Sequence, residues 1–176
     1  MQIVIRHPAD LDSHARQIRL SADRAVGAIK ALVAHEPDSL QILNALRFTE
    51  MGRHPLEDRP LNLVEQLNQT STCLVAGEAA RFVLERHPES EGIRLNMAAA
   101  SGLDLESLAP GIVAAEVFAA TRPQSNDKLR KDLARLATMA AAFRFRYVFF
   151  HAPGYTAGRQ PSLETAPGIE VWSLNV

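Results

Sequence analysis

Two acidic residues lie in apolar surroundings that seldom hold an unpaired charge. Asp104 follows a glycine in the segment 102–105, and Glu116 interrupts the apolar run 112–121. Burying a lone carboxylate in such a strand costs on the order of several kcal/mol unless a partner or an ion compensates it. Two carboxylates from neighbouring strands bind Mg²⁺ well, because hard cations prefer oxygen ligands. Such an ion polarises a phosphoryl oxygen and generates hydroxide near neutral pH, so the chemistry to expect is phosphodiester hydrolysis.

The pattern around these acids predicts the elements that must position them. Apolar and β-branched runs predict strands at 93–98, 103–108, 112–121, 145–150 and 169–174. Helical spacing predicts a long helix over 62–86 and a second helix over 126–139 that Ser125 or Asn126 can cap. This order of elements predicts a mixed α/β sandwich and not a regular βαβ alternation. Asp104 has a second interpretation, as a turn residue after Gly102.

The N-terminal third carries no catalytic motif. Helical spacing over 9–33 and a shorter helix from Asp38 towards Gly52 predict a helical appendage over 9–52. Two prolines in the segment 53–60 make it the best candidate for a linker. We therefore expect an N-terminal helical appendage over 1–55 and an α/β core over 56–176.

The two acids and their context resemble a known family. Asp104 on one predicted strand and Glu116-Val117-Phe118 on the next resemble the PD-(D/E)XK (restriction-endonuclease-like) nuclease superfamily, in which these acids meet across a hairpin. The predicted order of elements from residue 60 to 174 is similar to the αβββαβ core of that superfamily. The resemblance implies a Mg²⁺ or Mn²⁺ site formed by Asp104, Glu116 and the backbone carbonyl of Val117, with a mixed sheet flanked by helices.

One position departs from the family pattern. The family has a lysine where this chain has Phe118, and a period of two places Phe118 on the same face of the strand as Glu116. The family's lysine can migrate to another element, and the chain has three lysines, of which Lys128 lies in the first turn of the predicted helix. We expect Lys128 to supply the missing charge; the alternative is a solvated lysine beside Asp127.

The resemblance also points to a third acid, since some members of the family use a glutamate on the long helix. Glu65 is the candidate for that metal ligand. An alternative follows from local sequence, because Asn62 with Glu65 three residues later is similar to a capping box. The sequence leaves the two interpretations open.

Charge is unevenly distributed although the whole chain has 19 basic and 20 acidic residues. Residues 122–146 carry seven Lys and Arg against two Asp. This excess predicts binding to nucleic acid phosphates through Arg122, Arg130, Lys131 and Arg135, with DNA favoured over RNA. The alternative is a solvated helix face.

Two functions from different classes fit these observations. The first is a metal-dependent nuclease that uses Asp104, Glu116 and Lys128, and a homodimer is compatible with it. The second is a catalytically degenerate relative that acts as a binding or regulatory module, which Phe118 favours. No apolar run approaches the roughly 20 residues of a membrane span. The lone Cys73 and the absence of a leader pattern lead us to expect a cytoplasmic protein without a membrane partner.

Overall fold

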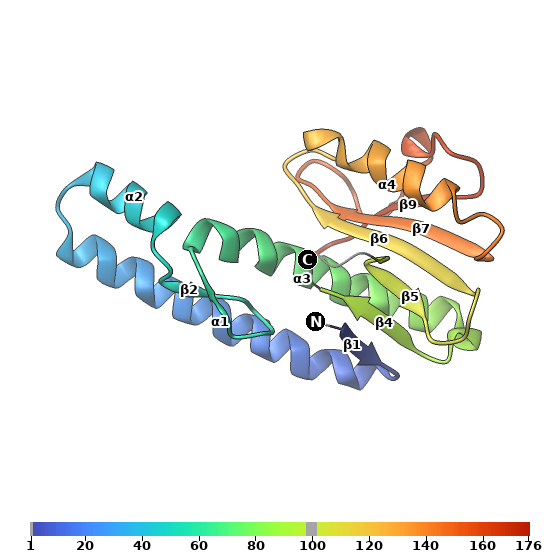
Figure 1. Ribbon diagram of the computed structural model, residues 1–176, viewed down its shortest axis with the longest axis horizontal. Helices are drawn as coiled ribbons and strands as arrows, with labels where there is room; N and C mark the ends of the chain where they lie inside the picture. Colours follow the sequence, from blue (N-terminus) through green and yellow to red (C-terminus); the bar gives the residue numbers. More distant parts are fainter. Residues whose placement is uncertain (1, 98–101) are drawn as a thin grey trace. The chain divides into compact units, whose positions relative to one another are not determined.

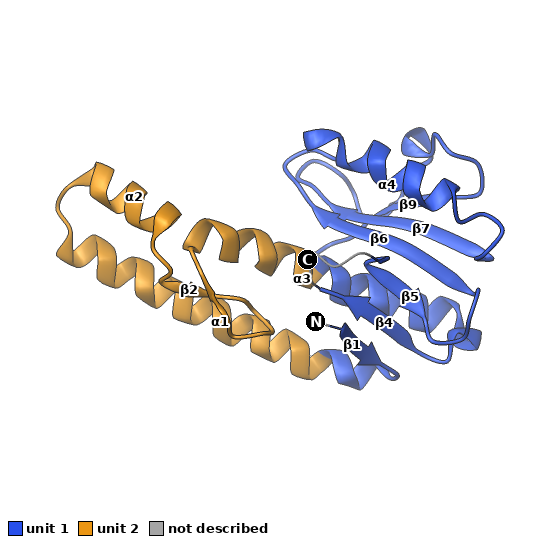
Figure 2. Cartoon of the chain, viewed as in Figure 1, with its two compact units in different colours: residues 1–11, 75–176 blue, residues 12–74 orange. Residues whose placement is uncertain are grey.

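The structure is a computed structural model that describes residues 2–97 and 102–176 (Figure 1). The chain forms two compact units: unit 1 comprises residues 1–11 and 75–176, and unit 2 comprises residues 12–74 (Figure 2). The division therefore differs from the one expected at residue 55. Its boundaries fall inside helices α1 (Pro8–His35) and α3 (Leu63–Arg86), where a continuous helical pattern gives no sequence signal.

Unit 1 contains a seven-stranded mixed sheet in the order β1-β4-β5-β6-β7-β9-β8. The pairs from β1 to β6 are antiparallel, whereas β6 with β7 and β7 with β9 are parallel. The strands are β1 (Gln2–Ile5), β4 (Ile93–Asn96), β5 (Leu105–Ser107), β6 (Val113–Ala119), β7 (Phe145–His151), β8 (Gly158–Arg159) and β9 (Glu170–Ser173).

Helices cover both faces of this sheet, so unit 1 is an α/β sandwich. Successive side chains of β6 point to opposite faces of the sheet, so they pack in two different hydrophobic cores. Val117 packs in the cluster that includes Val83 of α3, and Phe118 packs in the cluster that includes Leu133 of α4 (Lys128–Ala137). The expected α/β class with a mixed sheet and flanking helices is confirmed.

The long elements predicted from the sequence are confirmed, with ends that differ by a few residues. All five predicted strands and the helices of the core are present. The strands β1, β2 (Gly52–Arg53), β3 (Pro60–Leu61) and β8 were not predicted, because runs of two to four residues carry too little periodicity. Of the helices in the described ranges, none combines the length and the apolar composition that a bilayer span requires.

Unit 2 is helical, as expected for the appendage, but the expected linker is ordered. Asp38 caps α2 (Ser39–Phe48) by accepting a hydrogen bond from the N–H of Leu40 at 2.8 Å. Helix α2 ends at Phe48, before the expected Gly52. The segment 53–60 joins β2 to β3 and turns around buried His54, whose Nδ1 accepts backbone hydrogen bonds within the turn. The two prolines therefore shape a hairpin and not a linker.

Candidate functional site

Asp104 and Glu116 meet across the antiparallel pair β5 and β6. Leu105 lies opposite Ala115 in the register, so the next position places Asp104 opposite Glu116. The Val117 N–H donates a hydrogen bond of 2.9 Å to Asp104 Oδ2. Val117 itself is buried, and its backbone N–H lies beside Asp104. The hairpin geometry thus brings together the two acids that the sequence singled out.

Glu116 is buried and lacks normal hydrogen-bond partners. Its side chain is 1% exposed, and Arg135 Nη1 lies 3.0 Å from Oε1 as an ion pair. Neither carboxylate oxygen of Glu116 accepts a hydrogen bond of normal geometry from the protein. Burial, followed by the charge and hydrogen bonding of Asp104, raises the pKa of Glu116 to about 8. Near neutral pH Glu116 therefore holds a proton.

Helix α4 presents three charged side chains towards these acids. Lys128, Asp132 and Arg135 are spaced at i, i+4 and i+7, which places them on one face of the helix. Lys128 Nζ lies 2.7 Å from Asp132 Oδ1, and Arg135 also donates a hydrogen bond to the Gly102 carbonyl. Glu116, Asp104 and Asp132 interact electrostatically with one another and with these cations. The site is therefore a cluster of three carboxylates and two cations.

The sequence reasoning missed Asp132. Its side chain is only 6% exposed, and burial raises its pKa to about 6 although Lys128 opposes this rise. A signal was present, because Asp132 falls within the apolar stripe formed by Leu129, Leu133 and Leu136. A carboxylate in a stripe of buried leucines needs a partner for the same reason as Glu116 in its strand.

Lys128 lies over the residue that replaces the expected lysine. Its Nζ is 6.0 Å from the centre of the Phe118 ring, within the range of a cation–π contact. Burial works against the charged ammonium, but Asp132, Asp104 and Glu116 outweigh it and raise the pKa of Lys128. The ammonium therefore stays charged beside the acids, which fits the prediction that Lys128 supplies the displaced charge.

Glu65 and the carboxylate cluster belong to different units of the chain. Glu65 belongs to unit 2, is exposed, and its N–H donates a hydrogen bond of 2.8 Å to Asn62 Oδ1 at the start of α3. That bond matches the capping interpretation.

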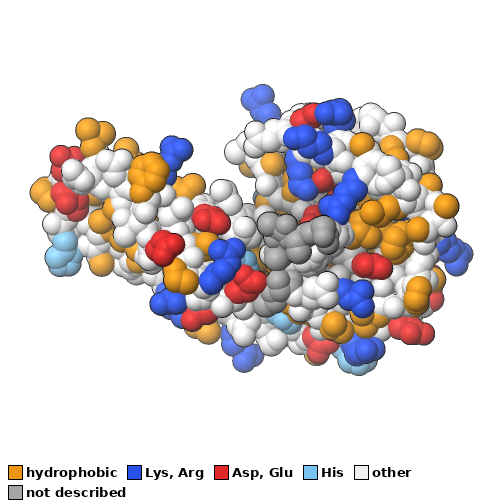
Figure 3. All heavy atoms as spheres, viewed as in Figure 1, with side chains coloured by type: hydrophobic (Ala, Val, Ile, Leu, Met, Phe, Trp, Pro, Cys, Tyr) orange, Lys and Arg blue, Asp and Glu red, His pale blue; other side chains and the backbone are white. Residues whose placement is uncertain are grey.

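The predicted phosphate-binding residues divide into two groups. Arg122, Arg130 and Lys131 are exposed, and Lys and Arg side chains gather over the α4 region in Figure 3. Arg130 is ion-paired with Asp127, and Lys131 Nζ donates a hydrogen bond of 3.3 Å to the Asn126 carbonyl. Arg135 differs, since it points inward to Glu116 and Gly102. Three of the four residues are thus exposed to solvent, and two of these three have partners within the protein.

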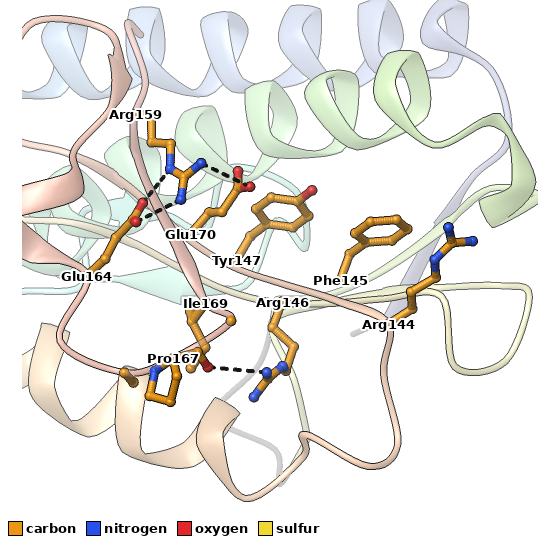
Figure 4. Close-up of a pocket in the computed structure, with 11 residues that line it drawn as sticks. Arg144, Phe145, Arg146, Tyr147, Arg159, Glu164, Pro167, Ile169 and Glu170 are labelled. Atoms are coloured by element: carbon orange, nitrogen blue, oxygen red, sulfur yellow. Dashed lines mark hydrogen bonds and ion pairs between the residues drawn. The ribbon is translucent and has the colours of Figure 1, made fainter.

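A separate pocket of about 270 Å³ lies at the start of β7 and β9 and does not include the acids (Figure 4). Arg159 in this pocket is paired with Glu164 at 2.7 Å and with Glu170 at 3.4 Å. Figure 4 shows Arg144 and Arg146 pointing to different sides of the strand. Arg159, Glu164 and Glu170 of this pocket are thus used in internal ion pairs.

Buried carboxylate oxygens without hydrogen-bond donors remain on Glu116 and Asp132 in this cluster. Within residues 2–97 and 102–176, no group of three or more His, Cys, Asp or Glu side chains is placed so that it could hold a metal ion. Comparison of the chain with protein-family models, with curated proteins and with solved structures gave no match.

Proposed function

We propose that this protein is a metal-dependent nuclease that hydrolyses phosphodiester bonds in DNA or RNA. The observation that carries the proposal is the placement of Asp104 opposite Glu116, with Lys128 and Arg135 beside them. Phosphodiester cleavage needs carboxylates for a cation and fixed positive charge near the phosphate. This cluster contains both kinds of group.

The order of elements supports the resemblance to the PD-(D/E)XK superfamily. Along the chain, α3, β4, β5, β6, α4 and β7 follow in the αβββαβ order of its core. Asp104 comes immediately before β5, and Glu116-Val117-Phe118 lies on β6. A restriction-endonuclease-like core is therefore part of the proposal.

In this function Asp104 and Glu116 would hold Mg²⁺ or Mn²⁺, with the Val117 carbonyl as the further ligand that the resemblance implies. The ion would supply Lewis acidity towards the phosphate and a nucleophile at neutral pH. Deprotonated Glu116 binds a cation best, so its proton leaves when the ion binds. Asp104 keeps its orientation through the hydrogen bond from the Val117 N–H.

The cations of α4 would act on the substrate. Lys128 brings positive charge to the acids, where it stabilises the charge that develops on the phosphate. Arg135, which lies 3.0 Å from Glu116, would offer a second positive charge to the phosphate. Arg122, Arg130 and Lys131 on the exposed surface would contact neighbouring phosphates of the strand, with DNA favoured.

A second function remains in competition with the first. Phe118 stands where the family has lysine, and Arg135 Nη1 already lies 3.0 Å from Glu116 Oε1 without any metal ion. Both features suit a degenerate relative that keeps the fold and binds nucleic acid or protein without cleaving it. Activity with Mn²⁺ decides between the two.

The test is cleavage of single-stranded and double-stranded DNA and RNA with Mg²⁺ and Mn²⁺. Asp104→Asn and Glu116→Gln should each reduce cleavage by at least about 10²-fold, as loss of one preorganised group usually does. Glu106→Gln is the matched control, because Glu106 lies on β5 two residues after Asp104 but pairs with Arg94 at 3.8 Å. Absence of cleavage in all substrates would favour the binding module, and equal loss in the control would remove Asp104 and Glu116 from the active site.

A further inference from the structure

Helix α2 of unit 2 is apolar on two opposite faces. On one face Ile42, Leu46 and the small Ala45 are half-buried. Helical spacing places Leu40, Leu43 and Phe48 on the opposite face, where they are 71%, 61% and 72% exposed. None of the ten residues of α2 is fully buried. Figure 3 shows hydrophobic side chains at the surface over this helix.

A helix of this composition requires a cover on its outer face. Helices that are apolar all round are normally buried, and helices shorter than about 12–15 residues depend on packing for their stability. The one charged residue within α2 is Arg47. Singly exposed leucines are ordinary on protein surfaces, but three large apolar side chains along one short helix form a patch of the kind that marks an interaction site.

The charges at the two ends of α2 are opposite. Glu36 and Asp38 precede the helix, and Arg47 lies in its last turn. If two copies of α2 pack antiparallel about a two-fold axis at the middle of the helix, the acidic end of each copy lies beside the basic end of the other. Leu40 of one copy then meets Phe48 of the second copy. The outer face of α2 is therefore complementary to itself in both charge and apolar pattern.

The exposed apolar area is sufficient for a small specific interface. Val33, in the last turn of α1, is 56% exposed and extends the apolar surface of the helical hairpin. Together with the three outer side chains of α2 it offers about 400 Å² per copy, at roughly 100 Å² for each side chain. Apolar atoms make up about 60% of an interface, so two copies would bury about 1,300 Å² in total. Specific interfaces begin at about 1,200 Å².

We propose that two copies of this chain form a dimer through the outer face of α2, with the two helices antiparallel. Leu43 lies near the two-fold axis of this arrangement, and the opposite charges lie at its ends. The pairing involves residues of unit 2 alone and does not depend on the nuclease proposal.

The first test is sedimentation equilibrium of the full chain from about 1 to 300 μM, which should show a monomer–dimer equilibrium. Leu43→Glu should raise the dimer Kd by at least about 100-fold, because two leucines leave the interface and two like charges meet near its axis. Leu20→Glu is the control, because Leu20 is similarly exposed (55%) but lies in the middle of α1. Circular dichroism should show that both variants keep the helical content of the wild type.

The second test is disulfide cross-linking, which reports the geometry directly. The native Cys73 is buried and only 2% exposed, so an introduced cysteine is the one that reacts. Asn44→Cys, on the outer face near the axis, should give a covalent dimer on mild oxidation, since two such residues can approach to the Cα separation of about 4.4–6.8 Å that a disulfide needs. Gln17→Cys, exposed on α1, should stay monomeric on a denaturing gel.

Three results would overturn the proposal. A wild type that is monomeric over the whole concentration range would assign the outer face of α2 to a different partner. A dimer that Leu43→Glu leaves intact would place the contact on another surface. Equal cross-linking of Asn44→Cys and Gln17→Cys would show unspecific collision in place of an antiparallel pair.

Discussion

Asp104 lies opposite Glu116 where the β5–β6 register is continued by one position, and the charge of Asp104 contributes to the raised pKa of Glu116. Two carboxylates this close cannot both ionise at little cost, so one of them keeps its proton. Burial selects Glu116 for this role, because its side chain is 1% exposed and Asp104 accepts a hydrogen bond from the Val117 N–H. The arrangement yields a neutral acid at the centre of a sheet near neutral pH.

This relationship predicts a pH-dependent difference in stability between the wild type and Glu116→Gln. The folded-state pKa of Glu116, about 8, exceeds its ordinary value of 4.5. Between these two pH values the folded protein therefore binds more protons than the unfolded chain. The stability that Glu116 contributes is present below pH 4.5 and is lost as the pH rises to about 8. Glutamine mimics the protonated acid, and the wild type should become less stable relative to it by on the order of a few kcal/mol. Urea unfolding of both proteins from pH 4.5 to 9 measures this; parallel curves would contradict it.

The affinity for a metal ion should depend on the protonation state of Glu116. Mn²⁺ must displace the proton of Glu116, so its affinity should increase as the pH rises towards the pKa of about 8 and then level off. Calorimetry in buffers of different ionisation enthalpy should detect the release of about one proton per ion below pH 7. Binding that does not change between pH 6 and 9 would mean that Glu116 is not the group that the ion meets.

Much of the fold could be predicted because long elements carry strong patterns. The apolar run of β6 and the stripe of α4 required burial, and the single acid in β6 marked the site. Short strands such as β1 were missed because four residues cannot establish a period. The paired register of Asp104 with Glu116 followed from the expected hairpin, which is local in sequence.

The rest of the site depends on contacts that are distant in sequence. Arg135 was predicted to meet phosphate, but its ion pair with Glu116 spans two elements and leaves no pattern in either. The unit boundaries at residues 11 and 74 could not be predicted from the sequence either, because they fall inside helices α1 and α3. Glu65 was a candidate metal ligand only because of the family resemblance. The sequence pattern gave no sign that it belongs to unit 2.

Lys128 and Phe118 offer a test of the displaced charge. Lys128→Ala should reduce Mn²⁺-dependent cleavage by about 10²- to 10³-fold with little loss of stability, since the side chain is 39% exposed. Phe118→Lys in that background should restore part of the activity, because position 118 already lies beneath the ammonium of Lys128. Lys30→Ala, which removes the same charge from helix α1, is the control. Equal activity in Lys128→Ala and the wild type would remove Lys128 from the mechanism.

The exposed cations predict salt-dependent binding to nucleic acid. Each phosphate contact releases condensed counterions, so log affinity should fall linearly with log salt concentration. Replacing Arg130 and Lys131 by alanine should reduce that slope by up to about two, whereas replacing Lys30 and Arg47 of unit 2 removes the same charge and should leave it unchanged. Fluorescence anisotropy with a labelled oligonucleotide gives both slopes. Equal slopes for the two double variants would show that the α4 surface is not the contact.

The central claim is that Asp104 and Glu116 together hold one divalent cation, and the most direct measurement is anomalous diffraction from a crystal soaked in Mn²⁺ near pH 8. The account predicts one strong peak within about 2.0–2.6 Å of an oxygen of each carboxylate, with Arg135 moved away from Glu116. A peak bound elsewhere, or none beside the two acids while Arg135 keeps its ion pair with Glu116, would contradict it.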